Sequence, residues 1–245
     1  MSKPVIGLIS HRTTEEDRPF NNYTKFVNTY PKRIIEAGGI PIGIIFPDGK
    51  FEIEQAELCD GFVLQGGPIL ESGQINAIKY AIDNKKPILG ICLGMQTMAG
   101  YNWVYNELGN EQTYKEIENF FKPEDEDYFL ERREGHDELN PFYLSQIDKS
   151  KHNIILDKDS RLFEIYKQSK INVPSLHGFV VKDNALDNSK LFKVVGKSED
   201  GTIEAIEGID SEHFMVGVQF HPELEEENIV LFKNLVKEVE QSKRK

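Results

Sequence analysis

Hydrophobic positions along the chain form short runs that alternate with amphipathic stretches. Helical spacing of the apolar residues predicts helices near Tyr23–Ala37, Gly73–Asn84, Met95–Gly100 and Glu226–Gln241. The apolar runs between and after them predict strands at Val5–Ser10, Ile40–Phe46, Gly61–Leu64, Pro87–Ile91, Phe192–Gly196, Ile203–Glu207 and Met215–Gln219. This alternation predicts an α/β fold: a mainly parallel, doubly wound sheet with helices on both faces.

One predicted strand delivers the chain directly to a cysteine. Pro87–Ile91 is followed by Cys92, with Gly90 and Gly94 two positions to either side and a predicted helix immediately after. A strand, a tight turn and a helix, with the reactive side chain at the turn, is the arrangement of a nucleophile elbow. The free N–H groups of the helix favour the thiolate, which is the reactive form of cysteine. We predict that Cys92 is a nucleophile.

A second apolar strand supplies a base and a carboxylate. The segment from Val216 reads Val-Gly-Val-Gln-Phe-His-Pro-Glu and places His221 two positions before Glu223. In an extended chain these side chains share a face, so Glu223 can orient one ring nitrogen while the other takes a proton from Cys92. The predicted catalytic triad is Cys92, His221 and Glu223.

The remaining requirement of such a site is a pair of donors for the oxyanion. The expected donors are the backbone N–H of Leu93 and an N–H of the Gly66-Gly67 turn, where glycine lets the backbone approach a substrate. The other cysteine, Cys59, lacks flanking glycines and is expected to be an inert core thiol.

These motifs resemble the class I glutamine amidotransferase superfamily, and the resemblance extends over most of the chain. It looks closest to the gamma-glutamyl hydrolase branch, peptidase C26, which includes gamma-glutamyl-gamma-aminobutyrate hydrolase. Besides the elbow and the His-Pro-Glu element, it is carried by Val5 to Ile9, Tyr30 to Pro41, Asp60 to Gly67, His152 to Leu162, Val173 to His177 and Asp200 to Glu207.

The resemblance implies a flavodoxin-like class I glutamine amidotransferase fold and a hydrolase of gamma-glutamyl amides that uses no cofactor. Cys92 would form a gamma-glutamyl thioester, and Gln96 and His177 would bind substrate. Ser175-Leu176-His177 matches an element that lines the site in this branch, although a structural histidine fits His177 equally well. The stretch from Ala99 to Val104 departs from the branch's pattern after the elbow helix, so the amine of the substrate stays open.

Composition narrows the class of protein further. The 245 residues fit one domain, 1–245, with a variable insert near 101–149. A formal net charge of −12 argues against nucleic acid or an anionic membrane as a partner. Two cysteines make no disulfide framework and no apolar run approaches the length of a membrane span, so the expected location is the cytoplasm. No metal-ligand spacing occurs in the sequence.

The sequence is therefore compatible with three classes of function. The first is a free-standing hydrolase acting on a small-molecule gamma-glutamyl substrate, which the match after His152 favours. The second is a glutaminase subunit that delivers ammonia to a synthase partner. The third is a binding protein on the same fold, against which the complete triad argues. A homo-oligomer is compatible with all three.

Overall fold

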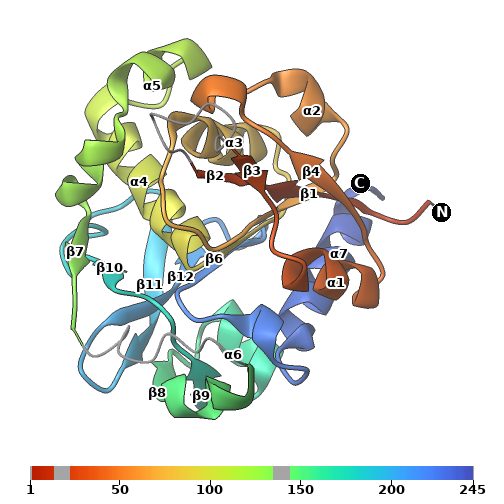
Figure 1. Ribbon diagram of the computed structural model, residues 1–245, viewed down its shortest axis with the longest axis vertical. Helices are drawn as coiled ribbons and strands as arrows, with labels where there is room; N and C mark the ends of the chain where they lie inside the picture. The colour runs from red at the N-terminus through yellow and green to blue at the C-terminus, as the bar shows by residue number, and fades with distance from the viewer. Residues whose placement is uncertain (1, 14–22, 135–143, 245) are drawn as a thin grey trace.

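The computed structural model describes residues 2–13, 23–134 and 144–244. Its main sheet has the strand order β4-β1-β5-β6-β13-β12-β11-β8-β9 within these residues. The first five strands in this order run parallel to one another (Figure 1). They are β4 (Ile40–Ile44), β1 (Val5–Ile9), β5 (Gly61–Leu64), β6 (Ile88–Ile91) and β13 (Met215–Val218). The doubly wound parallel sheet is thus confirmed in the half that carries the predicted site.

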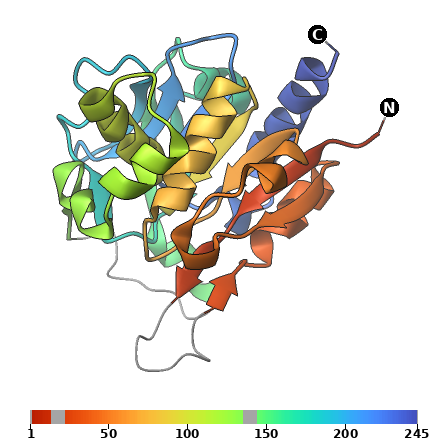
Figure 2. The ribbon, with the colours of Figure 1, turned by 90° about the horizontal axis from the view of Figure 1, so that it is seen from above.

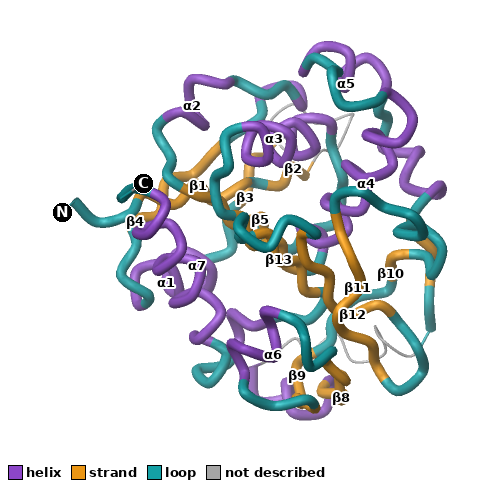
Figure 3. The backbone as a smooth tube through the Cα atoms, turned by 180° about the vertical axis from the view of Figure 1, so that it is seen from behind, coloured by secondary structure: helices purple, strands orange, loops and turns teal. Residues whose placement is uncertain are grey.

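The other half of the sheet is antiparallel. Strand β13 pairs antiparallel with β12 (Ile203–Gly208), and the sheet continues through β11 (Phe192–Ser198), β8 (Lys151–Leu156) and β9 (Lys170–Pro174). Figure 3 shows β4 and β9 at opposite margins of the sheet. The complete sheet is therefore mixed, with β13 at the boundary between its two halves.

Helices cover both faces of this sheet, as predicted (Figure 2). One apolar cluster joins the sheet to α1 (Thr29–Glu36), α6 (Arg161–Tyr166) and α7 (Ile229–Ser242). The cluster on the opposite face joins it to α2 (Ile53–Glu57), α3 (Ser72–Asp83), α4 (Leu93–Leu108) and α5 (Tyr114–Phe120). Strands β5, β6 and β13 are buried along their whole length, because helices cover them on both sides.

The prediction of one helix over Tyr23–Ala37 is wrong for its first part. Residues Tyr23–Lys25 form β3, which pairs antiparallel with β2 (His11–Thr13), and α1 begins only at Thr29. The side-chain amide of Gln65 explains the extended conformation: it accepts from Val27 N–H at 2.9 Å and donates to Lys25 C=O at 2.7 Å. A contact from a distant residue overrides the local helical pattern here.

The segment near 101–149 begins within α4 and continues beyond the end of that helix. Helix α4 continues to Leu108, followed by α5, a 3-10 helix at Pro123–Tyr128, β7 (Leu130–Arg132) and a 3-10 helix at Leu144–Ser150. The Trp103 ring stacks on the rings of Phe120 and Tyr128, with centroid-to-centroid distances of 5.1 Å and 4.9 Å. Strand β7 pairs with β10 (Phe179–Val181), so this segment reaches the strand that follows His177. Residues 135–143 lie outside the described part of the chain.

Candidate active site

Cys92 occupies a strained turn between β6 and α4. Its backbone has φ 52° and ψ −109°, a conformation that side-chain-bearing residues rarely adopt. The turn is held by a hydrogen bond from Cys92 N–H to Val218 C=O at 2.8 Å. Gly94 must be glycine, because a Cβ there would lie 2.3 Å from the Leu64 carbonyl oxygen. The predicted elbow geometry is present, and the thiol residue is 8% exposed.

The base and the carboxylate lie beside this turn. Val218 pairs with Ile91 in register, so the chain leaves β13 next to the end of β6 and brings His221 to Cys92. His221 Nδ1 lies 2.7 Å from Glu223 Oε1, and Glu223 is buried in a 3-10 helix at Pro222–Leu224. A hydrogen bond from His221 N–H to Pro174 C=O, 3.1 Å long, ties this segment to the end of β9.

The electrostatics of His221 depend on its two neighbours. Burial acts to lower the pKa of the imidazole, because it disfavours the charged form. The charge of Glu223 and the charge and hydrogen bond of Cys92 outweigh burial, so the pKa of His221 lies well above its ordinary value of 6.5. The ring can therefore accept a proton from the thiol and retain it.

The Gly66-Gly67 turn faces the same two residues. A Cβ on Gly66 would lie 3.0 Å from His221 Cε1 and 3.4 Å from Cys92 Cβ, which leaves room for glycine alone without a shift. The N–H of Gly66 is already engaged, because it donates to the Tyr30 hydroxyl at 2.9 Å. The N–H groups of Gly67 and Leu93 have no acceptor among the described residues, and these two remain the available oxyanion donors.

Gln96 is fastened to the protein through its amide nitrogen. Its Nε2 donates to Phe179 C=O at 2.8 Å and to Gln219 Oε1 at 3.1 Å. Both N–H groups are thus used within the fold, and a direct substrate contact would have to use the carbonyl oxygen. The substrate-binding role of Gln96 stays a prediction.

His177 belongs to a buried cluster around a glutamate. Its Nε2 lies 3.4 Å from Glu204 Oε1, and His152 Nε2 lies 3.1 Å from the same oxygen. Burial alone would raise the pKa of Glu204, but hydrogen bonds from the two histidines outweigh it and the pKa is lowered. His177 is 4% exposed. These contacts give His177 a structural function, and the predicted substrate contact remains a prediction.

Comparison with known proteins places this geometry in a family. The family model described as Peptidase C26 matches residues 71–223, which is more than half of the chain and includes Cys92, His221 and Glu223. The chain belongs to the peptidase C26 family. Membership supports a cysteine-type amidohydrolase or a glutamine amidotransferase.

Individual relatives of this C26 protein agree with that assignment. A glutamine amidotransferase-like protein of Rickettsia prowazekii is 27% identical, with 96% of this chain and 97% of the relative covered. The CTP synthase of Nautilia profundicola is 34% identical over 161 residues, which cover 62% of this chain and 29% of the relative. The C26 chain thus spans about a third of the length of such CTP synthases.

Solved structures show the fold of the C26 protein. The glutaminase domain of Trypanosoma brucei CTPS with bound acivicin superimposes with a TM-score of 0.66 at 15% identity, covering 97% of this chain and 94% of that one. A glutamine amidotransferase from Thermotoga maritima gives a TM-score of 0.57 at 15% identity, covering 100% and 87% of the two chains. The resemblance to the class I glutamine amidotransferases is thereby confirmed for the fold.

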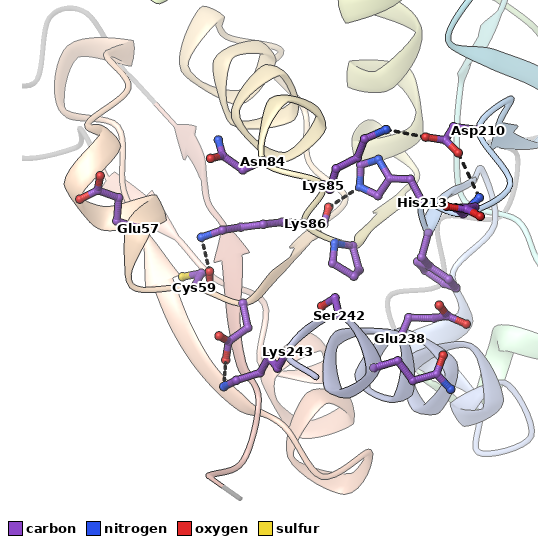
Figure 4. Close-up of a pocket in the computed structure, with 15 residues that line it drawn as sticks. Glu57, Cys59, Asn84, Lys85, Lys86, Asp210, His213, Glu238, Ser242 and Lys243 are labelled. Atoms are coloured by element: carbon purple, nitrogen blue, oxygen red, sulfur yellow. Dashed lines mark hydrogen bonds and ion pairs between the residues drawn. The ribbon is translucent and has the colours of Figure 1, made fainter. Parts of the chain in front are cut away.

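A cavity of the C26 protein, drawn in Figure 4, lies at the end of the sheet opposite to Cys92. It has a volume of about 520 Å³ and includes Asp60 and Pro87, which precede β5 and β6, whereas Cys92 follows β6. Two of its lysines are paired, since Lys85 lies 2.5 Å from Asp210 and Lys243 lies 2.7 Å from Asp60, whereas Lys86 donates to the backbone carbonyls of Ala56 and Cys59.

The described residues contain neither a metal-binding cluster nor a membrane-spanning helix. Residues 2–13, 23–134 and 144–244 contain no group of three or more His, Cys, Asp or Glu side chains arranged to hold a metal ion. None of the helices in these ranges has the length and apolarity needed to cross a membrane.

Sequence reasoning missed four polar residues around the site: Tyr30, Arg33, Gln65 and Glu204. Each acts through a contact to a residue far away in the sequence, such as Tyr30 to Gly66 or Arg33 to Glu223. One signal was present: Tyr30 and Arg33 stand three positions apart, and therefore on one face, in the apolar stripe of the first helix.

Proposed function

We propose that this protein is a cysteine hydrolase that cleaves the gamma-glutamyl amide bond of a small gamma-glutamyl amine. The observation that carries the proposal is the 2.7 Å contact of His221 Nδ1 with Glu223, next to a cysteine held in a strained elbow. This arrangement suits acyl transfer to a thiol. Membership of the peptidase C26 family also supports a hydrolase.

The first half of the proposed reaction forms a thioester. His221 Nε2 takes the proton of the Cys92 thiol, and the sulfur attacks the gamma-carbonyl carbon as the carbonyl π electrons move to oxygen. The N–H groups of Leu93 and Gly67 donate to this oxyanion. When the carbonyl re-forms, the C–N bond breaks, His221 gives its proton to the leaving amine, and the gamma-glutamyl group remains on sulfur.

The second half of the reaction releases glutamate. His221, now neutral, removes a proton from water, and the resulting hydroxide attacks the thioester carbon. The C–S bond breaks and His221 returns the proton to the sulfur. Glu223 holds the ring in one tautomer through Nδ1 and stabilises its charged form in both halves. Because a thiol nucleophile persists best under reducing conditions, we place this reaction in the cytoplasm.

A second candidate is a glutaminase that delivers ammonia to a synthase partner. The CTP synthases among the relatives favour it, since this chain aligns with about a third of their length. The chemistry at Cys92 would be unchanged, with glutamine as substrate and ammonia as the leaving group. The two candidates therefore differ in the leaving amine and in the need for a partner.

Glutamate release from L-glutamine and from a panel of gamma-glutamyl amines separates these candidates, with Cys92→Ala as the control. We expect faster release from at least one gamma-glutamyl amine than from glutamine, and none in the variant. Activity on glutamine alone, or none without a partner, would favour the synthase-linked glutaminase. Undiminished turnover by Cys92→Ala would overturn both candidates.

A further inference from the structure

Helix α1 presents two buried polar side chains to the catalytic segments. Tyr30 is 1% exposed and Arg33 is 6% exposed, and residues three apart lie on one face of a helix. The mechanism proposed above assigns neither of them a function. Burial of a guanidinium and a phenol is costly unless their polar atoms find partners, so these partners show what the helix face does.

Tyr30 connects the oxyanion turn to the triad. Its hydroxyl oxygen accepts from Gly66 N–H at 2.9 Å. That bond leaves the hydroxyl proton to be donated, and the buried Glu223 carboxylate, whose Oε2 has no hydrogen-bond partner among the described residues, lies beside it. Burial, followed by the charges of Glu223 and Cys92, raises the pKa of Tyr30 well above its ordinary value. The phenol therefore stays protonated and can act as a donor.

Arg33 holds the main chain of the same glutamate. Its Nε donates to Glu223 C=O at 3.0 Å in a buried contact. Its NH1 atom lies 2.8 Å from Glu36 Oε2, so the guanidinium charge is paired at the edge of the helix. Glu223 is thus held at its backbone by Arg33 and at its carboxylate by His221, and the Tyr30 hydroxyl lies beside that carboxylate.

We propose that Tyr30 and Arg33 are positioning residues, which together fix Glu223 and the Gly66-Gly67 turn relative to Cys92. Neither side chain is required to touch substrate. By engaging Gly66 N–H, Tyr30 leaves Gly67 N–H as the donor of that turn for the oxyanion. The proposal rests on the proposed function only where turnover is the readout, so a measurement without substrate is included.

The variant Tyr30→Phe tests the hydroxyl while keeping the ring that fills the core. The variant loses the acceptor of Gly66 N–H and the hydroxyl beside Glu223, so we expect kcat to fall about tenfold with KM changed less than about threefold. Without the hydroxyl beside it, the charge of Glu223 should attract the imidazolium of His221 more strongly and raise the pKa of His221 further. The alkaline limb of the pH profile of kcat/KM should therefore move to higher pH.

The same shift is measurable without turnover. Iodoacetamide alkylates the sulfur of Cys92, and the pH dependence of the alkylation rate responds to a change in the pKa of the neighbouring His221. The matched control is Tyr101→Phe, because Tyr101 is also buried and its hydroxyl accepts from Gln112 Nε2 at 3.3 Å on the opposite face of the sheet. We expect a displaced profile in Tyr30→Phe and the wild-type profile in Tyr101→Phe.

Arg33→Met, with Glu36→Gln as its control, tests the second contact. Arg33→Met keeps the aliphatic stem but loses the bond to Glu223, whereas Glu36→Gln loses only the ion pair at the helix edge. We expect a kcat decrease of about tenfold in the first and none in the second. If Arg33→Met does not fold, Tyr30→Phe alone decides. Wild-type kcat and an unshifted alkylation profile in Tyr30→Phe would overturn the proposal.

Discussion

Nδ1 of His221 lies 2.7 Å from Oε1 of Glu223, two positions further along the chain. This contact leaves Nε2 for Cys92 and makes the tautomer of the ring depend on one carboxylate. Both of these residues can be substituted while the Cys92 thiol is kept.

Replacing that carboxylate should slow the reaction. Glu223→Gln keeps the shape of the side chain, but its amide can present either a donor or an acceptor to Nδ1, so the imidazole is no longer held in one tautomer. We expect kcat to fall by about 10²- to 10⁴-fold. Steady-state kinetics check this, with Glu226→Gln as a control for the charge alone. A rate close to wild type would assign the orienting function to another group.

The same substitution should change how stability depends on pH. The pKa of folded His221 is raised, so its interaction with Glu223 stabilises the protein fully below about pH 6.5, the ordinary value. That contribution is lost as the pH rises through the folded pKa. Urea titrations at several pH values should therefore show the largest destabilisation by Glu223→Gln below about pH 6.5. A difference that grows with pH would contradict this assignment.

The elbow should be more stable with glycine at position 92. Cys92→Ala removes the nucleophile and should abolish turnover with little loss of stability, because the alanine keeps the same strained backbone. Cys92→Gly relieves that strain, and we expect it to be more stable than Cys92→Ala by about 1 kcal/mol, after the entropy cost of glycine. Thermal denaturation of both inactive variants measures the difference, and a more stable alanine variant would argue against strain.

The two cysteines should differ in reactivity. Burial, the largest effect, raises the pKa of the Cys59 thiol to about 11, and this residue is 2% exposed. Cys92 has an imidazole beside it to receive its proton. Mass spectrometry after brief iodoacetamide treatment near neutral pH should find a single adduct, on Cys92. Labelling of Cys59 in folded Cys92→Ala would show that its burial is incomplete.

Two glycines of α4 should respond differently to alanine. A Cβ on Gly94 would meet the main-chain oxygen of Leu64 at 2.3 Å, which cannot move aside cheaply. We expect Gly94→Ala to cost at least about 2 kcal/mol of unfolding free energy. In Gly100→Ala the contacts are side-chain ends of Phe129 and Ile75 at 2.9 and 3.0 Å, and helix propensity improves. Urea denaturation should therefore show Gly100→Ala to be much the milder variant.

Local patterns were enough to predict the elbow, the His-Pro-Glu element and the parallel strands. In each of these the deciding residues stand within a few positions of one another, as Gly90, Cys92 and Gly94 do. Strands β8 and β9 were missed because they lie at the margin of the sheet, where polar residues alternate with apolar ones. The assignment of β8 depends on pairing with β11, and that of β9 on pairing with β8, which no local pattern contains.

The supporting contacts could not be predicted for a related reason. Arg33 and Glu223 are 190 positions apart, and the tyrosine that meets Gly66 is 36 positions before it. Only the fold brings such pairs together. His177 illustrates the same point, since it lies in the loop after β9 while its neighbours Glu204 and His152 come from the strands β12 and β8.

The central position of β13 has a consequence for biosynthesis. This strand enters between β6 and β12, and it is translated after every other strand of the sheet. Until it emerges from the ribosome, the nascent chain holds Cys92 without its base, and β6 has an open edge beside the future elbow. The site therefore cannot be complete before this last strand has joined the sheet, and chains that end before Met215 should be inactive and prone to aggregate.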